Sequence, residues 1–319
     1  MASNTTYLMP VLFGSLFLNV PCHPIDPTFS KEAIEHSWSK TKPKIIFCEG
    51  KLVQMVKKAI FDTGLKCDIY TLNGEVTGIK KVEDLFVAKT NDESNFQPLE
   101  IESGDQTAIV LCSSGSTGLS KAVTISHKYW TQLFSIFTDT DQDIVLTFSS
   151  LYWLSGLMGF LNAGITGATH LLISEPFHPD LALHLIDKYK VTKTLLPPRN
   201  IALILNSPEI GKKSLKSLRT VTCGGARLPP EIRQRFKQQL VPNCLLLFGY
   251  GMTEKGLIAA AFIEEKVDST GVVGFNTEIK IVDEEGNNLG VGEDGEIMVR
   301  NPVKWSGYYG DQEATDEVY

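Results

Sequence analysis

Short apolar runs alternate with amphipathic segments through the middle of the chain. Residues 179–190 and 229–240 repeat apolar side chains at helical intervals, and both begin with proline, which suits the first turn of a helix. Five apolar runs around them have the length of buried strands: residues 143–148, 169–174, 193–197, 219–223 and 244–250. This alternation predicts an α/β fold in which helices cover both faces of a parallel sheet.

The pattern changes after about residue 271. Residues 277–300 alternate apolar and polar side chains around the turn-rich sequences DEEGN and GEDG. Alternation with acidic turns predicts a β hairpin or a small barrel. We therefore expect an α/β unit over residues 1–270 and a β-rich subdomain over residues 271–319.

Residues 7–20 form the most apolar segment near the start of the chain, YLMPVLFGSLFLNV. They are too few to span a bilayer as a helix. They could be the apolar part of a signal peptide, but Lys31 is the first basic residue and no small-x-small cleavage site follows. The segment is therefore interpreted as a buried helix, in a protein without a transmembrane segment that stays inside the cell.

Composition narrows the possible functions. The chain of 319 residues is 43% hydrophobic and 21% charged, which is typical of a soluble globular protein. Its net charge of −7, without any basic run, argues against a sequence-independent nucleic-acid binder. The six cysteines and six histidines are dispersed without metal-ligand spacing. We expect free thiols of a reducing compartment and no metal site built from these residues.

A glycine-rich stretch, CSSGSTGLSKAVTISH at residues 112–127, follows a predicted strand. Its small residues would let backbone N–H groups approach an anion, and Lys121 adds a positive charge. The spacing fits neither the Walker A pattern nor GxGxxG, because Gly115 and Gly118 are three residues apart and no Ser or Thr follows Lys121. Alone, the stretch could be a phosphate cradle or a surface turn.

Two other strands end in similar sequences, CGGARL at residues 223–228 and GYGMTE at residues 249–254. Parallel sheets bind ligands at the carboxyl ends of their strands, so these stretches and the glycine-rich one should face one crevice. Together they offer exposed backbone, an aromatic ring, hydroxyls and a carboxylate. This combination predicts an ATP site with Mg²⁺.

These stretches occur in a recognisable order. SSGSTGLSK, GGARL, YGMTE and GEIMVRNP…GYYG…EAT resemble the successive signatures of the adenylate-forming (AMP-binding) superfamily, which includes acyl-CoA synthetases, 4-coumarate–CoA ligases and beetle luciferases. The order and spacing match over nearly the whole chain. The insect acyl-CoA synthetase and luciferase-like branch is the most similar.

The resemblance implies a two-step reaction: a carboxylic acid and Mg·ATP give acyl-AMP and pyrophosphate, and CoA then takes the acyl group. The acid would be fatty or aryl, because LMGFLNAG and NIALILN make an apolar pocket floor. Thr117, Lys121, Thr253 and Glu254 are the implied catalytic residues. Thr253 would contact the α-phosphate and Glu254 would hold Mg²⁺. The implied phosphate-binding residues are Ser113, Ser114, Gly115, Ser116, Thr117, Gly118 and Lys121.

The other implied site residues lie in the two later loops. Gly224, Gly225 and Ala226 would line the adenine and acyl slots, and Tyr250 would stack on the base, followed by Gly251, Met252 and Thr253 around the nucleotide. Trp153, Gly225 and Gly249 would border the acyl pocket. As single residues, Tyr250 could instead be a core aromatic and Glu254 a solvated carboxylate.

The sequence departs from the family pattern in three places. Trp153 stands where many relatives have a histidine against the acyl carboxylate, either as a reshaped gate or as a residue packed in the core. The sequence begins at the family's first helix and ends at EATDEVY, before its ribose-binding aspartate and its small C-terminal domain with a catalytic lysine. The compartment is expected to be cytoplasmic or peroxisomal, because some relatives carry a C-terminal peroxisomal address; Glu-Val-Tyr, where this sequence ends, is no such signal.

These departures leave alternatives to the ligase. One is a catalytically impaired remnant that binds ATP or an acyl group. The other is a luciferase-like oxygenase. The oligomeric state and the particular acid do not follow from the sequence.

Overall fold

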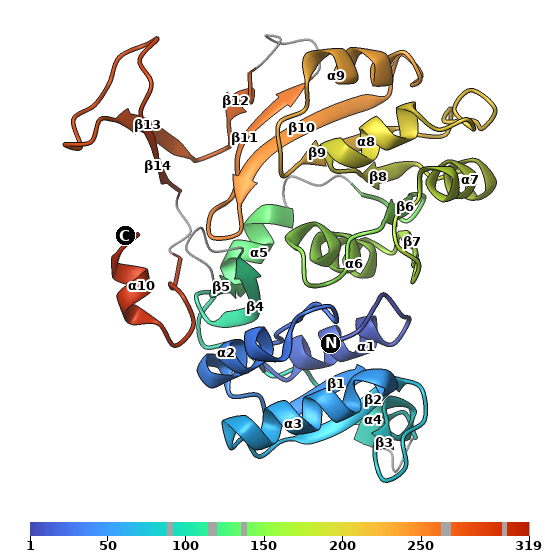
Figure 1. The fold of residues 1–319 in the computed structure, drawn as a ribbon, viewed down its shortest axis with the longest axis vertical. Helices are drawn as coiled ribbons and strands as arrows, with labels where there is room; N and C mark the ends of the chain where they lie inside the picture. Colours follow the sequence, from blue (N-terminus) through green and yellow to red (C-terminus); the bar gives the residue numbers. More distant parts are fainter. Residues whose placement is uncertain (88–91, 114–119, 135–138, 263–268, 302–304, 319) are drawn as a thin grey trace.

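The largest sheet of the described chain, hereafter the central sheet, has seven strands and lies in the upper half of Figure 1. The computed structural model describes residues 1–87, 92–113, 120–134, 139–262, 269–301 and 305–318. The strand order is β12-β11-β10-β9-β8-β6-β7, and the ladders from β7 to β10 are all parallel, whereas β11 and β12 are antiparallel. The strands are β6 (Ile144–Thr147), β7 (Thr169–Leu171), β8 (Lys193–Leu195), β9 (Thr220–Gly224), β10 (Leu245–Met252), β11 (Gly256–Phe262) and β12 (Val272–Val273). All five predicted strands and their parallel arrangement are confirmed.

Helices cover the two faces of this sheet, as predicted. On one face, α7 (Pro179–Tyr189), α8 (Pro198–Leu205) and α9 (Pro230–Lys237) bury their apolar residues against alternate strand residues such as Leu146, Val221 and Leu246. On the other face, α6 (Leu154–Thr166) contacts β6 and β7. Proline begins α7, α8 and α9, and its fixed φ suits the first helical turn.

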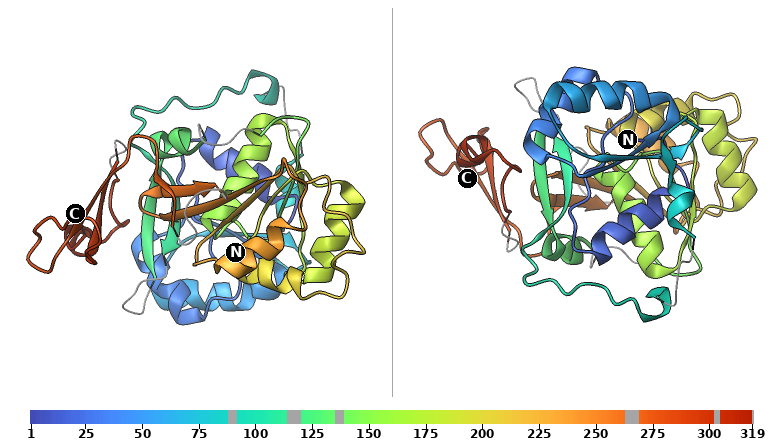
Figure 2. Two further views of the ribbon diagram at one scale, coloured as in Figure 1. Left: turned by 90° about the horizontal axis from the view of Figure 1, so that it is seen from above. Right: turned by 90° about the horizontal axis from the view of Figure 1, so that it is seen from below.

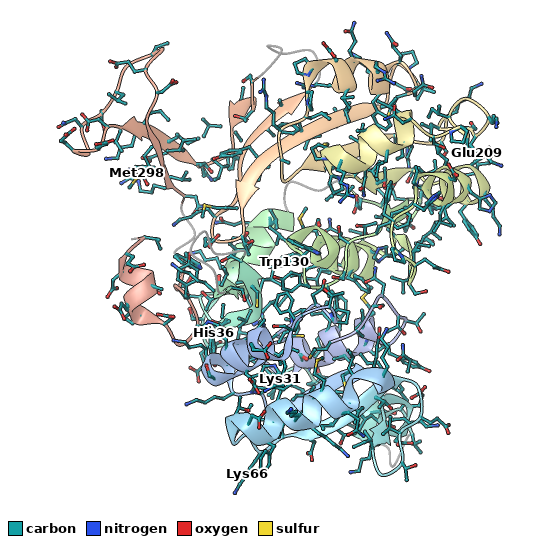
Figure 3. All side chains as sticks on the ribbon, viewed as in Figure 1. Lys31, His36, Lys66, Trp130, Glu209 and Met298 are labelled. Atoms are coloured by element: carbon teal, nitrogen blue, oxygen red, sulfur yellow. The ribbon has the colours of Figure 1, made fainter. Side chains whose placement is uncertain are left out.

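The amino-terminal part forms a smaller parallel sheet, β1 (Ile45–Glu49), β2 (Asp68–Asn73) and β3 (Lys80–Lys81), which lies at the lower end of Figure 1. Two helices, α2 (Lys31–Thr41) and α3 (Val53–Thr63), share its core. The short elements are η1 (Gly50–Leu52), η2 (Val82–Leu85) and α4 (Asp92–Asn95). Lys66, just after α3, lies at the outer surface in Figure 3.

An antiparallel pair lies between the two sheets in Figure 1, formed by β4 (Thr107–Ser113) and β5 (Lys121–Ser126) and followed by α5 (His127–Phe134). Its apolar residues share one core with α1 (Leu8–Phe17) and α6. Leu8 and Leu12 of α1 are buried there, so the helix predicted within residues 7–20 is confirmed over residues 8–17, whereas the end of the segment, from Phe17 to Val20, is mostly exposed. Among the described residues, no helix is long and apolar enough to span a membrane. Trp130 of α5 lies inside this region (Figure 3).

The last part of the chain begins with a β hairpin, β13 (Glu278–Val282) paired with β14 (Glu296–Arg300). Of the two predicted alternatives, the structure shows the hairpin, which projects from the rest of the molecule in both views of Figure 2. Met298 of β14 is 41% exposed (Figure 3). The division of the chain at residue 270 stays a prediction; β12 pairs with β11 of the central sheet, and α10 (Gln312–Asp316) follows a segment that pairs with β5.

The cysteines are all free thiols, as expected. Burial raises the pKa of Cys22 and Cys48 to about 11 and that of Cys223 to about 12. These thiols therefore stay protonated and unreactive at neutral pH. The described residues also contain no group of three or more His, Cys, Asp or Glu side chains that could hold a metal ion.

Candidate functional site

The carboxyl ends of β9 and β10 bring the two predicted loops together. The parallel register pairs Cys223 with Phe248 and Gly224 with Gly249. A Cβ atom at Gly224 would lie 2.7 Å from the carbonyl oxygen of Gly249, which is too close for any other residue without a shift of the backbone. The glycine therefore lets the two loops approach each other at the edge of the sheet.

A cavity of about 870 Å³ opens along the face of the sheet opposite the core formed with α7, α8 and α9, and only the first residues of α8, Pro198 to Asn200, line it. The expected apolar floor at NIALILN is wrong, because the buried apolar residues of this helix belong to that core on the other face. Because side chains alternate between the faces of a strand, every second residue of β6 and of the first half of β10 contributes to this cavity, whereas all three residues of β8 line it. The contributing residues include Val145 and Thr147 of β6, Leu195 of β8, Thr220 and Thr222 of β9, and Leu245 and Leu247 of β10. The predicted residues Gly224, Gly225, Ala226, Gly249, Gly251, Met252 and Thr253 line the same cavity. Nucleotide-binding and acyl-binding candidates thus share one space.

Trp153 also lines this cavity. It immediately precedes α6, has extended backbone, and meets the ring of Tyr152 edge-on with centroids 5.0 Å apart. Its 52% exposure shows that it is a wall residue and not a core residue. Its indole can shape the entrance, but it offers only one N–H donor and no titratable group.

The far end of the cavity is polar. Lys193 lines it at the start of β8, and its Nζ lies 2.7 Å from Asp139 and 3.2 Å from Asp143. Burial raises the pKa of Asp143, but hydrogen bonds from Thr192, Thr140 and Lys193 outweigh it and lower this pKa to about 2. The charged cluster closes the end of the sheet that lies opposite the glycine loops.

Tyr250 lines a second cavity of about 680 Å³. This cavity shares Gly225, Ala226, Gly249 and Gly251 with the first one, so the two lie next to each other. Tyr250 is 38% exposed and is therefore not a core aromatic. Its ring lines this cavity together with glycine backbone, and an aromatic face of this kind suits the stacking of a flat base.

Glu254 is buried, with 7% exposure, and is therefore not a solvated carboxylate. Its Oε1 accepts a hydrogen bond from the hydroxyl of Tyr308 at 3.0 Å. The carbonyl oxygen of the neighbouring Thr253 accepts one from Tyr129 at 3.2 Å. The carboxylate and hydroxyl oxygens of these residues suit Mg²⁺, which is usually held by one or two carboxylates together with substrate phosphates. The residues therefore fit a nucleotide-borne Mg²⁺.

Ser113 and Lys121 flank the glycine-rich stretch and pair with each other across β4 and β5. The stretch between them, which contains Ser114, Gly115, Ser116, Thr117 and Gly118, lies outside the described residues. The Nζ atom of Lys121 lies 4.9 Å from the centre of the Tyr308 ring and 3.8 Å from the carboxylate of Glu317. Lys121 and Glu254 thus meet at one tyrosine.

Two site residues did not follow from the sequence. Tyr308 belongs to the GYYG signature, but the pattern gave no reason to place its hydroxyl on Glu254. Tyr129, in α5, has no local signal at all. Both contacts join residues far apart in the chain, so only the folded arrangement reveals them.

Comparison with known proteins identifies the family. A family model described as AMP-binding enzyme matches residues 1–309. The chain is 28% identical to the probable 4-coumarate–CoA ligase 1 of Dictyostelium discoideum, over 99% of this chain and 61% of that relative. It is 29% identical to the luciferin 4-monooxygenase of Photuris pensylvanica, over 96% of this chain and 59% of that relative.

A solved structure is similar over almost the whole chain. The luciferase-like enzyme of the nonluminescent mealworm Zophobas morio has a TM-score of 0.88 and 29% identity, covering 97% of this chain and 74% of that one. The chain belongs to the AMP-binding enzyme family and has its α/β fold. It spans about three fifths of the length of the two curated relatives.

Proposed function

We propose that this member of the AMP-binding enzyme family activates a hydrophobic carboxylic acid with ATP and transfers the acyl group to CoA. In the first step, a carboxylate oxygen bonds to the α-phosphorus of ATP. The bond from that phosphorus to the bridging oxygen breaks, and pyrophosphate leaves with the electron pair. In the second step, the thiol sulfur of CoA bonds to the acyl carbon, AMP leaves, and the thiol proton goes to solvent.

One observation carries this proposal. The glycine loops after β9 and β10 and the apolar face of the sheet line the same cavity of about 870 Å³. Acyl transfer to a nucleotide needs the two reactants in contact, since positioning supplies much of the rate enhancement when no base is required. A volume of this size also lies in the range of small-molecule sites.

Different residues of the chain would bind the base, the phosphates and Mg²⁺. Tyr250 and the backbone of Gly225 and Ala226 hold the base in the second cavity. Thr253 lines the first cavity and would contact the α-phosphate there. Lys121 and the residues 113–118 bind the outer phosphates. Glu254 and Thr253 would hold Mg²⁺, which neutralises charge on the phosphates when bound.

The walls of the first cavity favour a hydrophobic acid. Val145, Leu195, Leu247 and Leu257 border it on the sheet side, and Met158 borders it on the α6 side. A short acid such as acetate has little apolar surface to bury against these walls, so hydrophobic burial would not offset the loss of water around its carboxylate. A fatty or aryl acid fits, and the name of the Dictyostelium relative, a probable 4-coumarate–CoA ligase, points in the same direction.

Acid-dependent exchange of labelled pyrophosphate into ATP tests the first step with the chain of 319 residues. We expect exchange with medium-chain fatty acids or aryl acids and none with acetate. Lys121→Ala should lower the exchange rate on the order of a hundredfold, because a preorganised charge on the phosphates is lost. Lys212→Ala, at a side chain that is 65% exposed, is the matched control and should leave the rate unchanged.

The other outcomes identify the alternatives. ATP binding without exchange for any acid would contradict the ligase and leave a nucleotide-binding remnant. Exchange followed by oxygen consumption without acyl-CoA formation would instead indicate an oxygenase, as the name of the Photuris relative suggests.

A further inference from the structure

Tyr308 contacts two residues of the proposed catalytic machinery at once. Its hydroxyl donates to Oε1 of Glu254 at 3.0 Å, and its ring lies 4.9 Å below Nζ of Lys121. Glu254 lies in the turn between β10 and β11, next to Thr253 of the cavity wall, and Lys121 lies at the start of β5, so the tyrosine joins this turn to β5. Tyr308 and Glu254 are 9% and 7% exposed, which removes the competing hydrogen bonds of bulk water.

The segment around Tyr308 is held firmly in place. Tyr308 forms an antiparallel bridge with Val123, and the backbone N–H of Tyr309 donates to the carbonyl of Ala122 at 2.7 Å. The backbone N–H of Tyr308 donates to Oγ1 of Thr315 at 2.9 Å, and the Tyr308 ring meets that of Trp305 edge-on, with the ring centroids 4.8 Å apart. This segment therefore extends the β4–β5 pair and fixes the tyrosine ring on both sides.

The hydrogen bond from Tyr308 restricts the orientation of the Glu254 carboxylate. The hydroxyl donates to Oε1 and so limits rotation about the last side-chain bond of Glu254. One carboxylate oxygen is thus held by the protein itself.

We propose that Tyr308 is a positioning residue that orients Glu254 toward the nucleotide-borne Mg²⁺ and supports the ammonium of Lys121. This inference rests on the proposed function, because it takes Glu254 as the Mg²⁺ ligand. Tyr308 does not touch the substrates; it acts through Glu254. Partners of this kind around metal ligands typically change metal affinity by about 10–100-fold when removed.

The test is the Mg²⁺ requirement of ATP binding, measured by isothermal titration calorimetry on the chain of 319 residues. Tyr308→Phe keeps the ring under Lys121 and removes only the hydroxyl. We expect it to raise the Mg²⁺ concentration for half-maximal ATP affinity about tenfold while the affinity for ATP without Mg²⁺ stays unchanged. Tyr309→Phe, the same change one residue later, is the matched control and should change neither value.

Glu254→Gln separates this inference from the proposed function. If Glu254→Gln leaves the Mg²⁺ requirement unchanged, Glu254 is not the ligand and the assignment under the proposed function fails. If Glu254→Gln changes it and Tyr308→Phe does not, only the positioning role of Tyr308 is overturned. The double variant should resemble Glu254→Gln alone, because a residue that acts through Glu254 adds nothing once that carboxylate is gone.

A third variant keeps the test decisive if Tyr308→Phe does not fold. Tyr308→Met removes the hydroxyl, fills the space of the ring with a flexible side chain, and leaves the carboxylate of Glu254 unchanged. An increased Mg²⁺ requirement with an unchanged melting temperature would support the inference. An unchanged Mg²⁺ requirement would overturn it.

Discussion

The two faces of the central sheet are built from the same strands and serve opposite purposes. Leu246 faces α7, α8 and α9 in a closed core, whereas its neighbour Leu247 lines the large cavity. The same contrast separates Val221 from Thr222 on β9. Because side chains alternate along a strand, one step in the sequence moves a residue from the stabilising face to the binding face. The contrast teaches that stability and specificity can change independently within one strand.

The largest expected loss of stability comes from substituting the buried leucine of the pair Leu246 and Leu247 on β10. Leu246→Ala removes a side chain that is 2% exposed and leaves a cavity, so the free energy of unfolding should fall by about 2–5 kcal/mol. Leu247→Ala only enlarges a cavity that already exists, so its loss should be under about 2 kcal/mol. Urea denaturation measures both values. Equal losses would show that the two faces do not differ in packing.

A smaller loss of stability is expected for a substitution at the edge of the sheet where the two glycine loops meet. The Cβ of Gly224→Ala would lie 2.7 Å from the carbonyl oxygen of Gly249, so the strands must separate. Overpacking of this kind costs about 1–3 kcal/mol, and ATP affinity should fall with it. Gly14→Ala in α1 is the control, since its Cβ meets nothing within 4 Å. Unchanged ATP affinity in Gly224→Ala would argue against a nucleotide at this edge.

The free energy of unfolding should fall at acid pH, partly because of His170 in β7. Burial lowers the pKa of His170 to about 4, and neither ring nitrogen has a hydrogen-bond partner among the described residues. The unfolded chain binds a proton near pH 6.5 and the folded chain does not. The contribution of His170 is therefore fully present above that pH and falls by about 1.4 kcal/mol per pH unit as the pH drops toward 4.

Replacing this histidine tests the sign of that dependence. His170→Leu should flatten the fall in the free energy of unfolding between pH 6.5 and 4, measured by urea denaturation at several pH values. His23, whose pKa burial also lowers to about 4, should keep part of the slope. The same replacement at exposed His184 serves as the control. An unchanged slope in His170→Leu would show that His170 is already protonated in the fold.

The smallest change in the free energy of unfolding is expected in the hairpin β13–β14, where the side chains of the tested ion pair are exposed to solvent. Arg300 of β14 pairs with Glu278 of β13, and the two side chains are 79% and 69% exposed. Exposed pairs of this kind are screened by salt and often contribute nothing measurable. Arg300→Ala should leave the urea midpoint unchanged within error at 0.15 M salt. A clear destabilisation would mean that the hairpin is more closely coupled to the core than its exposure indicates.

Much of this fold could be predicted from the sequence because helices and strands leave local patterns of apolar residues. Apolar runs and helical spacing predicted the five strands and both helices, and the rule for carboxyl ends predicted that residues 223–228 and 249–254 would meet. The same rule was wrongly applied to the glycine-rich stretch, because the strand before it, β4, pairs antiparallel with β5 outside the parallel sheet. Trp153 was ambiguous, since a tryptophan before a helix can pack inward or line a cavity. Tyr308 lies 54 residues from Glu254, and such a contact depends on how a later segment pairs with β5. No local pattern encodes that pairing.

We propose that an acyl group and a nucleotide share the cavity on the open face of the sheet. The most direct measurement is the affinity of the chain for a non-hydrolysable acyl-AMP analogue, with a sulfamate in place of the phosphate, compared with AMP. An analogue of the reaction intermediate should bind at least about a hundredfold more tightly than AMP. Leu247→Trp, which fills the acyl part of the cavity, should abolish that advantage. Equal affinities for the analogue and for AMP would contradict the account.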